Sequence, residues 1–372
     1  MALETLFITC GGTGGHFYPG LTIARAFQKN NGKVLLILSG INSKRQQAIA
    51  AEAGIEAVAL PNMPHPCKNP FAFLAGLAGG FKETRKLIKQ YDPDALLAMG
   101  SFAGLPIILA SLLAKIPLFL HDGNARVGRA NRHFSWCAKF LASAYPCVNR
   151  KKVHTKFFVT GMPVRDYLLE KCTLKKAPAI EELNDIYNSN LDPELKTILV
   201  FGGSLGAEVF NVNFPAGAVN CKEKGFQILH LCGHGKTEVA EKIYANADFP
   251  VLLLESSERM DLFLAAADLA VCRSGGSSLA ELAIFGVPAI LIPLPCAAEK
   301  HQNDNANVFA SAGAAVVFEN NDLDAAGAEK IISDFLHNPD KWQNMADKMQ
   351  SLARPDASQE LLDLISSTLN TK

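Results

Sequence analysis

The sequence contains no C-x-x-C pair, although it has nine cysteines among its 372 residues. Its opening, MALETLFITC, lacks the basic start and the long apolar stretch of a secretory signal. The simplest expectation is therefore a cytosolic protein with reduced thiols. His230, Cys232 and His234 are potential zinc ligands. Adjacent strand positions point to opposite faces and no fourth ligand is evident, so we predict no zinc site there.

The sequence also has no excess of either charge, because 36 Lys and Arg residues balance 36 Asp and Glu residues. Without a global basic excess, nucleic acid is not expected to be the main partner. Hydrophobic residues make up 49% of the chain and charged residues 19%, which is typical of a globular protein. A chain of 372 residues is long enough for two domains.

Two common nucleotide-binding signatures are incomplete. No glycine-rich turn matches G-x-G-x-x-G in register, which argues against an NAD enzyme. Gly235-Lys236-Thr237 is similar to the end of a P-loop, but His230 stands where that loop requires glycine. Asp92-Pro93-Asp94 has the Asp-x-Asp form of metal-dependent transferases, but it precedes a predicted strand. Ligands bind at the other end of such strands, so we interpret it as a solvated turn and expect no metal.

The longest apolar run, residues 95–120, would be long enough to span a bilayer. Breaking residues interrupt it at Gly100, Gly104, Pro106, Lys115 and Pro117. We therefore predict a buried strand over 95–99, a loop, a helix opened by Pro106, and a second strand over 117–121.

Two parts of the chain have the same pattern. A predicted strand over 5–10 is followed by Gly11-Gly12-Thr13-Gly14-Gly15-His16 and a helix over 19–30. A predicted strand over 197–201 is followed by Gly202-Gly203-Ser204-Leu205-Gly206-Ala207 and another helical stretch. Each is typical of the first βα turn of a doubly wound sheet, so we predict two Rossmann-like domains.

Glycine-rich turns let backbone N–H groups approach a phosphate, although tight packing explains such glycines equally well. A third turn, Arg273-Ser274-Gly275-Gly276-Ser277-Ser278, opens another predicted helix. Its serines suit a diphosphate and Glu281 suits a ribose diol, but Ser278 and Glu281 also fit a capping box. His16 lies at the mouth of the first turn, where an imidazole could accept a proton, cap its helix or bind phosphate.

Taken together and in order, these motifs resemble the MurG family, the N-acetylglucosaminyltransferases that convert lipid I to lipid II in peptidoglycan synthesis. The resemblance extends from about residue 3 to residue 317. It rests on the glycine turns at 11–16 and 202–207, with Pro19, Met99-Gly100-Ser101-Phe102, His121-Asp122-Gly123-Asn124, Gly161-Met162-Pro163-Val164-Arg165, Arg273-Ser274-Gly275, Ala280-Glu281 and His301-Gln302-x-x-Asn305-Ala306.

The resemblance implies an α/β protein with the GT-B fold, in which two Rossmann-like doubly wound parallel-sheet domains face a cleft. Residues 1–163 would bind the acceptor and the membrane, residues 164–341 would bind UDP-GlcNAc, and a helix over about 342–372 would pack back on the first domain. The implied reaction is an inverting, metal-independent transfer of GlcNAc to the C4 hydroxyl of the muramoyl sugar of lipid I. The enzyme would act peripherally at the cytoplasmic face of the cell membrane, in cell wall biogenesis and cell division.

The resemblance also implies roles for individual residues. His16 is the candidate base, with Asp122 as its partner or rival. UDP-GlcNAc is expected to contact Thr13, Gly14, Gly15, Asn124, Arg165, Ser204, Leu205, Ser257, Ser274, Gly275, Glu281, His301, Gln302 and Asn305. The pyrophosphate of the acceptor is expected to contact Gly12, Thr13, Gly15, Ser101 and Phe102. The sequence departs from the family at Asp122-Gly123, where Glu-Gln is usual, at Phe102, where Tyr is frequent, and at Leu205, where Gln is common.

A lipid-linked acceptor requires contact with the bilayer, and residues 68–86 combine apolar and cationic side chains. An apolar face with basic edges can enter anionic headgroups. The alternative is that the apolar residues are the core face of an ordinary amphipathic helix. We predict an anionic membrane surface as a partner, contacted by Phe71, Phe73, Leu74, Leu77, Phe81 and Lys82.

Three other functions share these sequence features. A related GT-B glycosyltransferase acting on another lipid or natural product would differ only in its N-terminal pocket. A hydrolysing sugar-nucleotide 2-epimerase has the same tandem architecture but no acceptor. A non-catalytic UDP-sugar-binding subunit is the third alternative, but both halves and His16 are present in this one chain.

Overall fold

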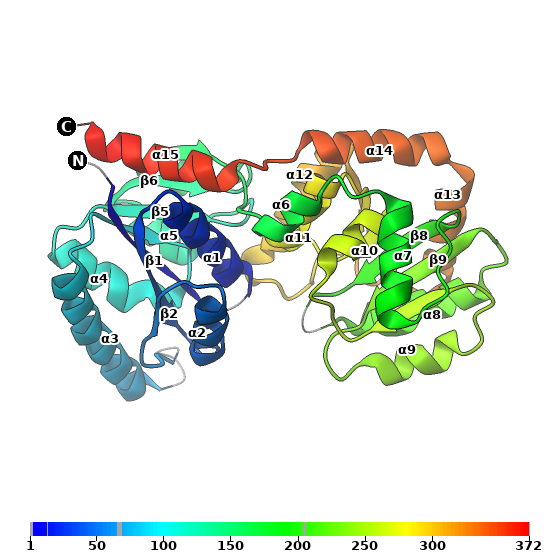
Figure 1. Cartoon of the computed structure of the whole chain (residues 1–372), viewed down its shortest axis with the longest axis horizontal. Helices are drawn as coiled ribbons and strands as arrows, with labels where there is room; N and C mark the ends of the chain where they lie inside the picture. Colours follow the sequence, from blue (N-terminus) through cyan, green and yellow to red (C-terminus); the bar gives the residue numbers. More distant parts are fainter. Residues whose placement is uncertain (1–2, 13, 65–68, 204–205, 372) are drawn as a thin grey trace. The chain divides into compact units, whose positions relative to one another are not determined.

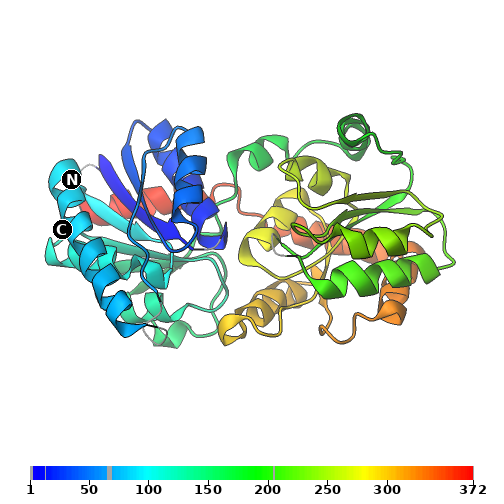
Figure 2. The same cartoon turned by 90° about the horizontal axis from the view of Figure 1, so that it is seen from below.

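The structure is a computed structural model that describes residues 3–12, 14–64, 69–203 and 206–371. The chain divides into two compact units. The N-terminal unit comprises residues 1–165 with 354–372, and the C-terminal unit comprises residues 166–353. Each unit has a parallel β-sheet with helices on both faces (Figures 1 and 2). The prediction of two Rossmann-like units of the α/β class is confirmed.

The N-terminal unit contains a seven-stranded sheet in the order β3-β2-β1-β4-β5-β6-β7. Its strands are β1 (Thr5–Gly11), β2 (Lys33–Ser39), β3 (Ala57–Ala59), β4 (Ala95–Ala98), β5 (Leu118–Asp122), β6 (Ala138–Ser143) and β7 (Lys156–Val159). Its helices are α1 (Gly14–Lys29), α2 (Ser43–Glu52), α3 (Pro70–Tyr91), α4 (Leu105–Leu113), α5 (Arg129–Phe134) and α15 (Ala357–Asn370), with 3-10 turns η1 (Phe102–Gly104) and η2 (Arg150–Lys152).

The central strand β1 is buried along its whole length, and this explains its unbroken apolar sequence. Leu6, Ile8 and Cys10 pack into the core that α1 and α15 cover. Phe7 between them packs into the opposite core, with residues of α3 and α4. The alternation places two separate cores on the two faces of one sheet.

The apolar run at 95–120 folds as predicted, into β4, η1, α4 and β5. Pro106 lies in the first turn of α4, where its missing N–H leaves no hydrogen bond unmade. Among the helices of the described residues, none combines the length and hydrophobicity needed to span a membrane.

Helix α3 continues without a break through Gly79-Gly80. Its glycines allow neighbouring segments to pack closely against the helix. A Cβ on Gly80 would lie 3.0 Å from Pro106 Cγ of α4, and one on Gly76 would lie 2.8 Å from the carbonyl oxygen of Asn62. The glycine side of α3 therefore packs against its own unit, and the other side of the helix carries its exposed residues.

The C-terminal unit contains a six-stranded sheet in the order β10-β9-β8-β11-β12-β13. Its strands are β8 (Lys196–Phe201), β9 (Phe226–Leu231), β10 (Val251–Leu254), β11 (Leu269–Cys272), β12 (Ala289–Leu291) and β13 (Ala315–Val317). Its helices are α6 (Asp166–Lys171), α7 (Lys176–Tyr187), α8 (Glu208–Asn220), α9 (Thr237–Tyr244), α10 (Met260–Ala266), α11 (Gly276–Phe285), α12 (His301–Ser311), α13 (Ala325–His337) and α14 (Pro339–Ser351), with the 3-10 turn η3 (Ala298–Lys300).

An aspartate joins the two central strands at the amino end of each sheet. Asp94, which precedes β4, accepts the backbone N–H of Thr5 at 2.8 Å. Asp268, which precedes β11, accepts the backbone N–H of Thr197 at 2.8 Å. The interpretation of Asp92-Pro93-Asp94 as a solvated turn is wrong for Asp94, whose carboxylate is bound to the start of β1.

The C-terminal segment is not one helix over 342–372 but two helices, α14 and α15. The break lies at residues 352–356, because Pro355 disfavours helical geometry at the residue before it. Trp342, Met345 and Met349 of α14 are buried in the C-terminal unit, so only α15 packs on the N-terminal unit. There it contributes Leu361, Leu362 and Ile365 to the core that α1 covers.

The three potential zinc ligands near the end of β9 have separate structural environments. His230 is fully buried, Cys232 is buried, and His234 is exposed beside Glu255. Asn211 Nδ2 donates to the carbonyl of Cys232, so its Oδ1 faces His230 and accepts the Nε2–H at 3.2 Å. Tyr244 then donates its hydroxyl to His230 Nδ1 at 3.2 Å. The network fixes a neutral histidine, and burial lowers its pKa to about 3.

We predict that the C-terminal unit loses stability as pH falls below about 6.5, the usual histidine pKa in an unfolded chain. Below that pH the unfolded state binds a proton that buried His230 does not, so unfolding is favoured by about 1.4 kcal/mol per pH unit. Trp342 lies in this unit and Trp136 in the other, so a Trp136→Phe background reports the C-terminal unit alone.

Urea unfolding, monitored by tryptophan fluorescence between pH 7.5 and 4.5 (about three pH units), measures this loss of stability. His230→Gln should flatten the pH dependence, whereas His234→Gln, at a site 60% exposed, should not. Identical pH profiles for the parent and His230→Gln would contradict the assignment.

Candidate functional site

The order of strands in each sheet defines where a ligand can bind. In the N-terminal unit the chain runs outward from β1 to β2 and β3 and then returns to place β4 on the other side of β1. The C-terminal unit repeats this reversal at β8 and β11. Ligands of doubly wound folds bind beyond the carboxyl ends of the strands at such a reversal. The candidate regions are therefore the turns after β1 and β4, and those after β8 and β11.

Helix α1 begins at Gly14 and not at the predicted position 19. The start was misplaced because Pro19 is typical of a first helical turn, whereas it lies inside α1. Gly14, Gly15 and His16 thus form the first turn, where backbone N–H groups have no intrahelical acceptor. Gly14 and Gly15 are exposed and His16 is half-buried. Thr13 lies outside the described residues.

Gly12 and Ser101, both predicted to bind the acceptor pyrophosphate, lie close together across the β1–β4 reversal. Gly12 has a φ of +82°, and a Cβ there would lie 3.7 Å from Ser101 Oγ. Asn42 Nδ2 donates to the Gly12 carbonyl at 2.8 Å and fixes the turn from the β2 side. Ser101 Oγ accepts the N–H of Ala103 and caps η1. Phe102 is 42% exposed on that turn.

The carboxylate of Asp122 is hydrogen-bonded within its own loop, although Asp122 is a candidate base from the sequence. Its buried carboxylate accepts four hydrogen bonds. Oδ1 accepts from Asn124 N at 3.2 Å and Asn124 Nδ2 at 3.5 Å. Oδ2 accepts from Gly128 N at 2.8 Å and Asn131 Nδ2 at 3.0 Å. These contacts make Asp122 suited to positioning Asn124.

His121 is a neutral neighbour of His16. Its Nε2–H donates to the Gly161 carbonyl at 3.1 Å. Burial lowers the pKa of His121, and the proximity of His16 lowers it further. Arg165 places its guanidinium 5.4 Å from the ring centre of Tyr18, on α1.

In the C-terminal unit the turn after β11 leads directly into α11. Gly275 is the N-cap of α11 and offers no side-chain hydrogen bond, so the capping-box alternative for Ser278 and Glu281 is wrong. Ser277 Oγ is buried and has no hydrogen-bond partner among the described residues. An uncapped helix start with a buried hydroxyl is suited to an anion. Ser204 and Leu205 of the turn after β8 lie outside the described residues.

Three residues predicted to bind the donor form one hydrogen-bonded network. Ser274 and Asn305 are fully buried. Ser274 Oγ donates to the Gln302 carbonyl at 2.8 Å, and Asn305 Nδ2 donates to the Ser274 carbonyl at 3.0 Å. Gln302 Oε1 accepts the N–H of Leu294 at 2.9 Å. The network therefore joins the ends of β11 and β12 to the first turn of α12.

Arg273 extends this network, a role that the sequence motif did not reveal. Its Nη1 donates to the carbonyl of Ile292 at 2.9 Å and to that of Pro293 at 3.3 Å. The guanidinium lies 5.1 Å from the ring centre of Phe210. Burial lowers the pKa of Arg273. An arginine before a serine-rich turn does not by itself predict these carbonyl contacts. They can be recognised only when the end of β12 is known to lie beside Arg273.

The backbone before α12 is strained. Glu299 and Lys300 have φ of +51° and +57°, in the left-handed region that residues other than glycine rarely adopt. His301 follows as the first residue of α12, one helical turn before Asn305. Neither residue is glycine, asparagine or aspartate, so this geometry could not be predicted from the residue types.

The remaining predicted donor residues are at the same edge of the sheet. Ser257 lies between β10 and α10 and accepts the backbone N–H of Arg259 at 3.0 Å. Its hydroxyl also pairs with the hydroxyl of Tyr187 at 3.0 Å. Glu281 is half-buried on α11, in the second turn.

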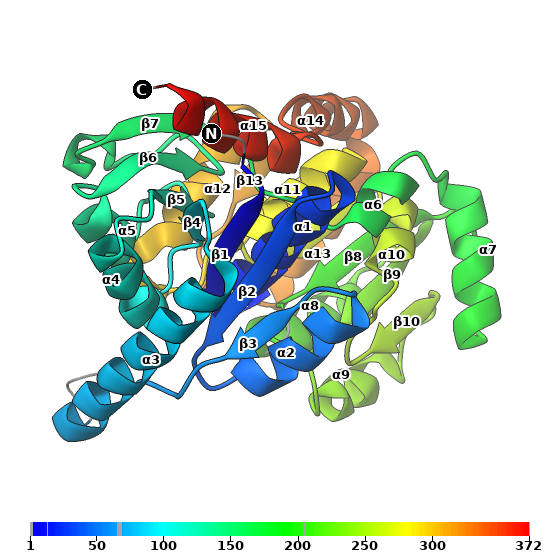
Figure 3. The same ribbon diagram turned by 60° about the vertical axis from the view of Figure 1, so that its left-hand side comes forward.

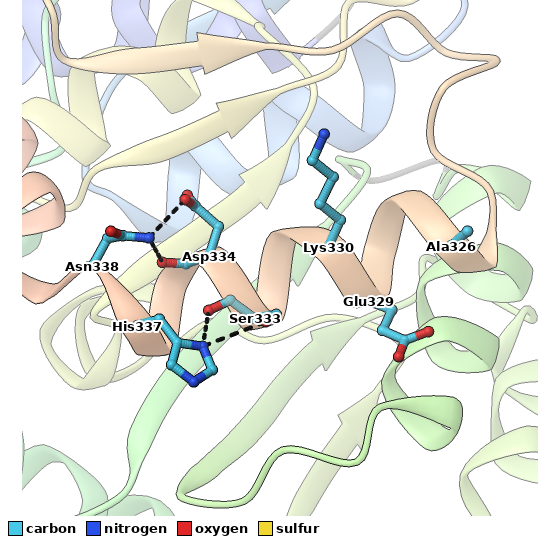
Figure 4. A pocket seen from close by; sticks show the side chains of 7 residues that line it. All are labelled: Ala326, Glu329, Lys330, Ser333, Asp334, His337 and Asn338. Carbon is cyan, nitrogen blue, oxygen red and sulfur yellow. Dashed lines mark hydrogen bonds between the residues drawn. The ribbon is translucent and has the colours of Figure 1, made fainter.

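A hollow on the surface of α13 has no connection with these residues (Figure 4). It is lined by Ala326, Glu329, Lys330, Ser333, Asp334, His337 and Asn338, all on α13 or at its end. His337 Nδ1 donates to the Ser333 carbonyl and Asn338 Nδ2 to the Asp334 carbonyl. These polar groups satisfy one another locally, so we assign no site to the hollow. No cluster of three potential metal-binding side chains occurs in the described parts of the chain.

Helices α3 and α4 and the turn η1 of the N-terminal unit expose several large apolar side chains. Phe71 is 84% and Leu74 is 57% exposed, so the alternative that they are core residues is wrong. Phe73, Leu77 and Phe81 are half-buried, and Phe73 stacks on Phe102 at 6.0 Å. We call the surface formed by Phe71, Leu74, Phe102, Leu109 and Leu113 the α3–α4 surface. Along α3, Phe81 lines a shallow hollow with Lys82, Arg85, Lys86 and Lys89.

The family comparisons agree with the two units. Residues 6–143 match the glycosyltransferase family 28 N-terminal domain, and residues 197–361 match the corresponding C-terminal domain. The two domain matches, on a fold with paired strand reversals, define a glycosyltransferase of the GT-B class, as predicted.

Individual relatives define the family more narrowly than the two domain matches do. The chain is 32% identical to the UDP-N-acetylglucosamine–N-acetylmuramyl-(pentapeptide) pyrophosphoryl-undecaprenol N-acetylglucosamine transferase of Halothermothrix orenii, over 98% of both chains. The crystal structure of Acinetobacter baumannii MurG superimposes with a TM-score of 0.77 at 26% identity, covering 98% of this chain and 99% of that one. The chain belongs to the MurG family, as the sequence motifs predicted.

The fold alone is shared more widely. A UDP-GlcNAc 2-epimerase from Neisseria meningitidis bound to UDP-GlcNAc superimposes with a TM-score of 0.71 at 16% identity, covering 99% of this chain and all of that one.

Proposed function

We propose that this glycosyltransferase moves GlcNAc from UDP-GlcNAc to the C4 hydroxyl of the muramoyl sugar of lipid I and so forms lipid II. The observation that carries the proposal is the 32% identity, over 98% of both chains, to a transferase whose name specifies that donor and acceptor. The residues at the strand reversals of both units are consistent with it.

The proposed reaction is a single inverting displacement. The acceptor C4 oxygen attacks C1 of GlcNAc, the bond from C1 to the UDP oxygen breaks, and the hydroxyl proton passes to a base. We assign His16 as that base, because it is half-buried in the first turn of α1, beside the glycine turn assigned to the acceptor. Asp122, with its carboxylate hydrogen-bonded on both oxygens, would position Asn124 for the donor sugar.

The departing UDP gains negative charge, and fixed groups can stabilise it. We assign the start of α11, with Ser274, Gly275 and the unpaired hydroxyl of Ser277, to the diphosphate. Arg165 would add a cation, and Ser204 and Leu205 are assigned to the same role from the motif alone. Such donors supply charge stabilisation without a divalent ion, and this supports a metal-independent reaction with no cofactor.

We assign the remaining contacts with UDP-GlcNAc from the positions of the residues in the C-terminal unit. Glu281 on α11 would accept hydrogen bonds from the ribose diol, and the backbone near Ser257 would contact uracil. His301, Gln302 and Asn305 would define the GlcNAc pocket. Because Asn305 Nδ2 and Gln302 Oε1 already have partners, these two residues would act through the shape of the turn and their remaining polar atoms.

The acceptor pyrophosphate is assigned to Gly12, Thr13, Gly15, Ser101 and Phe102. Ser101 Oγ lies beside Gly12, and the start of α1 adds a partial positive charge. The polyprenyl chain would leave over the α3–α4 surface, which begins at Phe102. The enzyme would accordingly work as a peripheral protein on an anionic membrane surface, at the cytoplasmic face.

We predict UDP release that depends on the acceptor and persists in EDTA. Purified protein would be given UDP-GlcNAc with and without a lipid I analogue, with excess EDTA present. Release without the acceptor would favour the epimerase reaction, and loss of release in EDTA would contradict metal independence. Donor binding without release under any condition would favour another acceptor or a non-catalytic subunit.

We predict that His16→Ala lowers kcat by about 10²–10⁴-fold, the usual contribution of a positioned base. The KM for UDP-GlcNAc should stay nearly constant, because the base contacts the acceptor hydroxyl. His133→Ala, which removes an exposed histidine of the same unit, is the matched control. Unaltered turnover in His16→Ala would remove this residue from the mechanism.

We predict that Phe71→Glu with Leu74→Glu abolishes flotation with vesicles of phosphatidylcholine and phosphatidylglycerol. Both side chains are exposed, so the change should act on membrane binding and not on folding. Release of UDP with a short-chain acceptor should remain. Ile186→Glu with Val239→Glu alters two exposed apolar residues of the C-terminal unit and should float normally. Unchanged flotation of the α3 variant would exclude the α3–α4 surface as the membrane contact.

A further inference from the structure

The connection from β2 to α2, residues Ser39–Gln46, is fixed to the glycine turn that is assigned to the acceptor. We call it the β2–α2 segment. Asn42 Nδ2 donates to the Gly12 carbonyl at 2.8 Å. A Cβ on Gly11 would lie 2.6 Å from the carbonyl oxygen of Ser39, and one on Gly40 would lie 3.3 Å from Gly12 Cα. Gly11 and Gly40, with φ of +135° and +99°, permit this close approach.

The segment exposes a large apolar side chain. Ile41 is 86% exposed, more than Phe71 on the α3–α4 surface. A single exposed isoleucine is ordinary on a protein surface, so its exposure alone indicates nothing. The position of Ile41 is what matters. The neighbouring Asn42 is hydrogen-bonded to a turn that the proposed function assigns to a substrate.

The segment is also electropositive. The first turn of α2 contains no acidic residue and carries Lys44 and Arg45, both exposed. Cations are unfavourable at this positive end of a helix dipole. Asn42 is the N-cap, but its side chain is bound to Gly12 and forms no capping hydrogen bond. The helix start and both cations therefore favour a negatively charged ligand.

Two buried polar atoms within the segment lack hydrogen-bond partners among the described residues. Ser39 and Gln46 are 2% and 5% exposed, and neither Ser39 Oγ nor Gln46 Oε1 has a hydrogen-bond partner among the described residues. Gln46 Oε1 points toward the glycine turn, 3.4 Å from where a Cβ on Gly11 would lie. Unsatisfied buried polar groups are uncommon in native structures, and a functional role is one of the explanations for them.

The sheet order indicates which part of the acceptor would reach the segment. Strand β1 lies between β2 and β4. Helices α3 and α4 pack on the face of the sheet that contains Phe7, whereas α2 packs with α1 on the opposite face (Figure 3). If the pyrophosphate occupies the turn after β1 and the lipid leaves over α3 and α4, the end of the acceptor remote from the lipid lies toward α2.

We propose that the β2–α2 segment is a subsite for the peptide carried by the acceptor sugar. Ile41 contacts aliphatic side chains of the peptide, and Lys44, Arg45 and the start of α2 pair with its carboxylates. The inference rests on the proposed function, since a peptide-bearing acceptor is required. With this subsite, the enzyme recognises the peptide in addition to the sugar and the pyrophosphate.

The test compares two acceptors that differ only in the peptide. One is a short-chain lipid diphosphate of N-acetylmuramic acid with its pentapeptide, and the other is the same compound without it. Lys44→Glu with Arg45→Glu should raise the KM for the peptide-bearing acceptor about tenfold, the loss expected for one charge-assisted pair. Ile41→Asp should act in the same direction. The KM for the peptide-free acceptor and for UDP-GlcNAc should change less than about twofold.

Matched substitutions elsewhere in the N-terminal unit provide the control. Val148→Asp alters another exposed apolar residue, and Lys151→Glu with Lys152→Glu reverses two exposed cations. Both should leave the preference for the peptide-bearing acceptor intact. Equal effects of the segment variants on both acceptors, or no effect on either, would overturn the inference while the transferase function stands. Wild-type protein that transfers to neither acceptor would overturn the proposed function, and this inference with it.

Discussion

The structure depends on strands that are buried on both faces. In β1 and in β8 beyond its first residue, every side chain is buried, so the central strands present no surface to a ligand. A ligand instead meets the turns at the strand ends. Strand order then selects among those turns, because ligands of doubly wound folds bind where neighbouring turns diverge, here at the β1–β4 and β8–β11 reversals. Gly12, Ser101 and Ser274 lie at these reversals, whereas Ser257 follows the edge strand β10.

The two units use their turns differently. In the N-terminal unit, glycines with positive φ bring backbones together, and side chains such as Asn42 and Asp122 hold the loops by accepting or donating to main-chain groups. In the C-terminal unit, buried side chains join three segments into one network, and Arg273 fastens it to the end of β12. Rigid support of this second kind is suited to holding a sugar nucleotide in one orientation.

Much of this could be predicted from the sequence. Apolar runs ending in glycines marked the strands, and the ordered motifs identified the family. Prediction failed where a residue fits more than one pattern, since Pro19 resembles a helix start but lies inside α1. Ser278 with Glu281 left a capping box open as an alternative, although α11 begins earlier, at Gly276. It also failed for contacts between distant segments, such as Asp94 with Thr5 or Arg273 with Ile292, because nothing in the local sequence encodes the partner.

The path of the last helix has a consequence for how the protein is made. Helix α15 supplies Leu361, Leu362 and Ile365 to the core of the N-terminal unit. Gly161 also packs against Arg354 and Ala357, where a Cβ would lie 2.6 Å from Arg354 Cβ. On the ribosome, the first unit therefore emerges with one face of its core still open, while the second unit can bury its own core as it appears. The first half of the chain to be synthesised is the last to be completed.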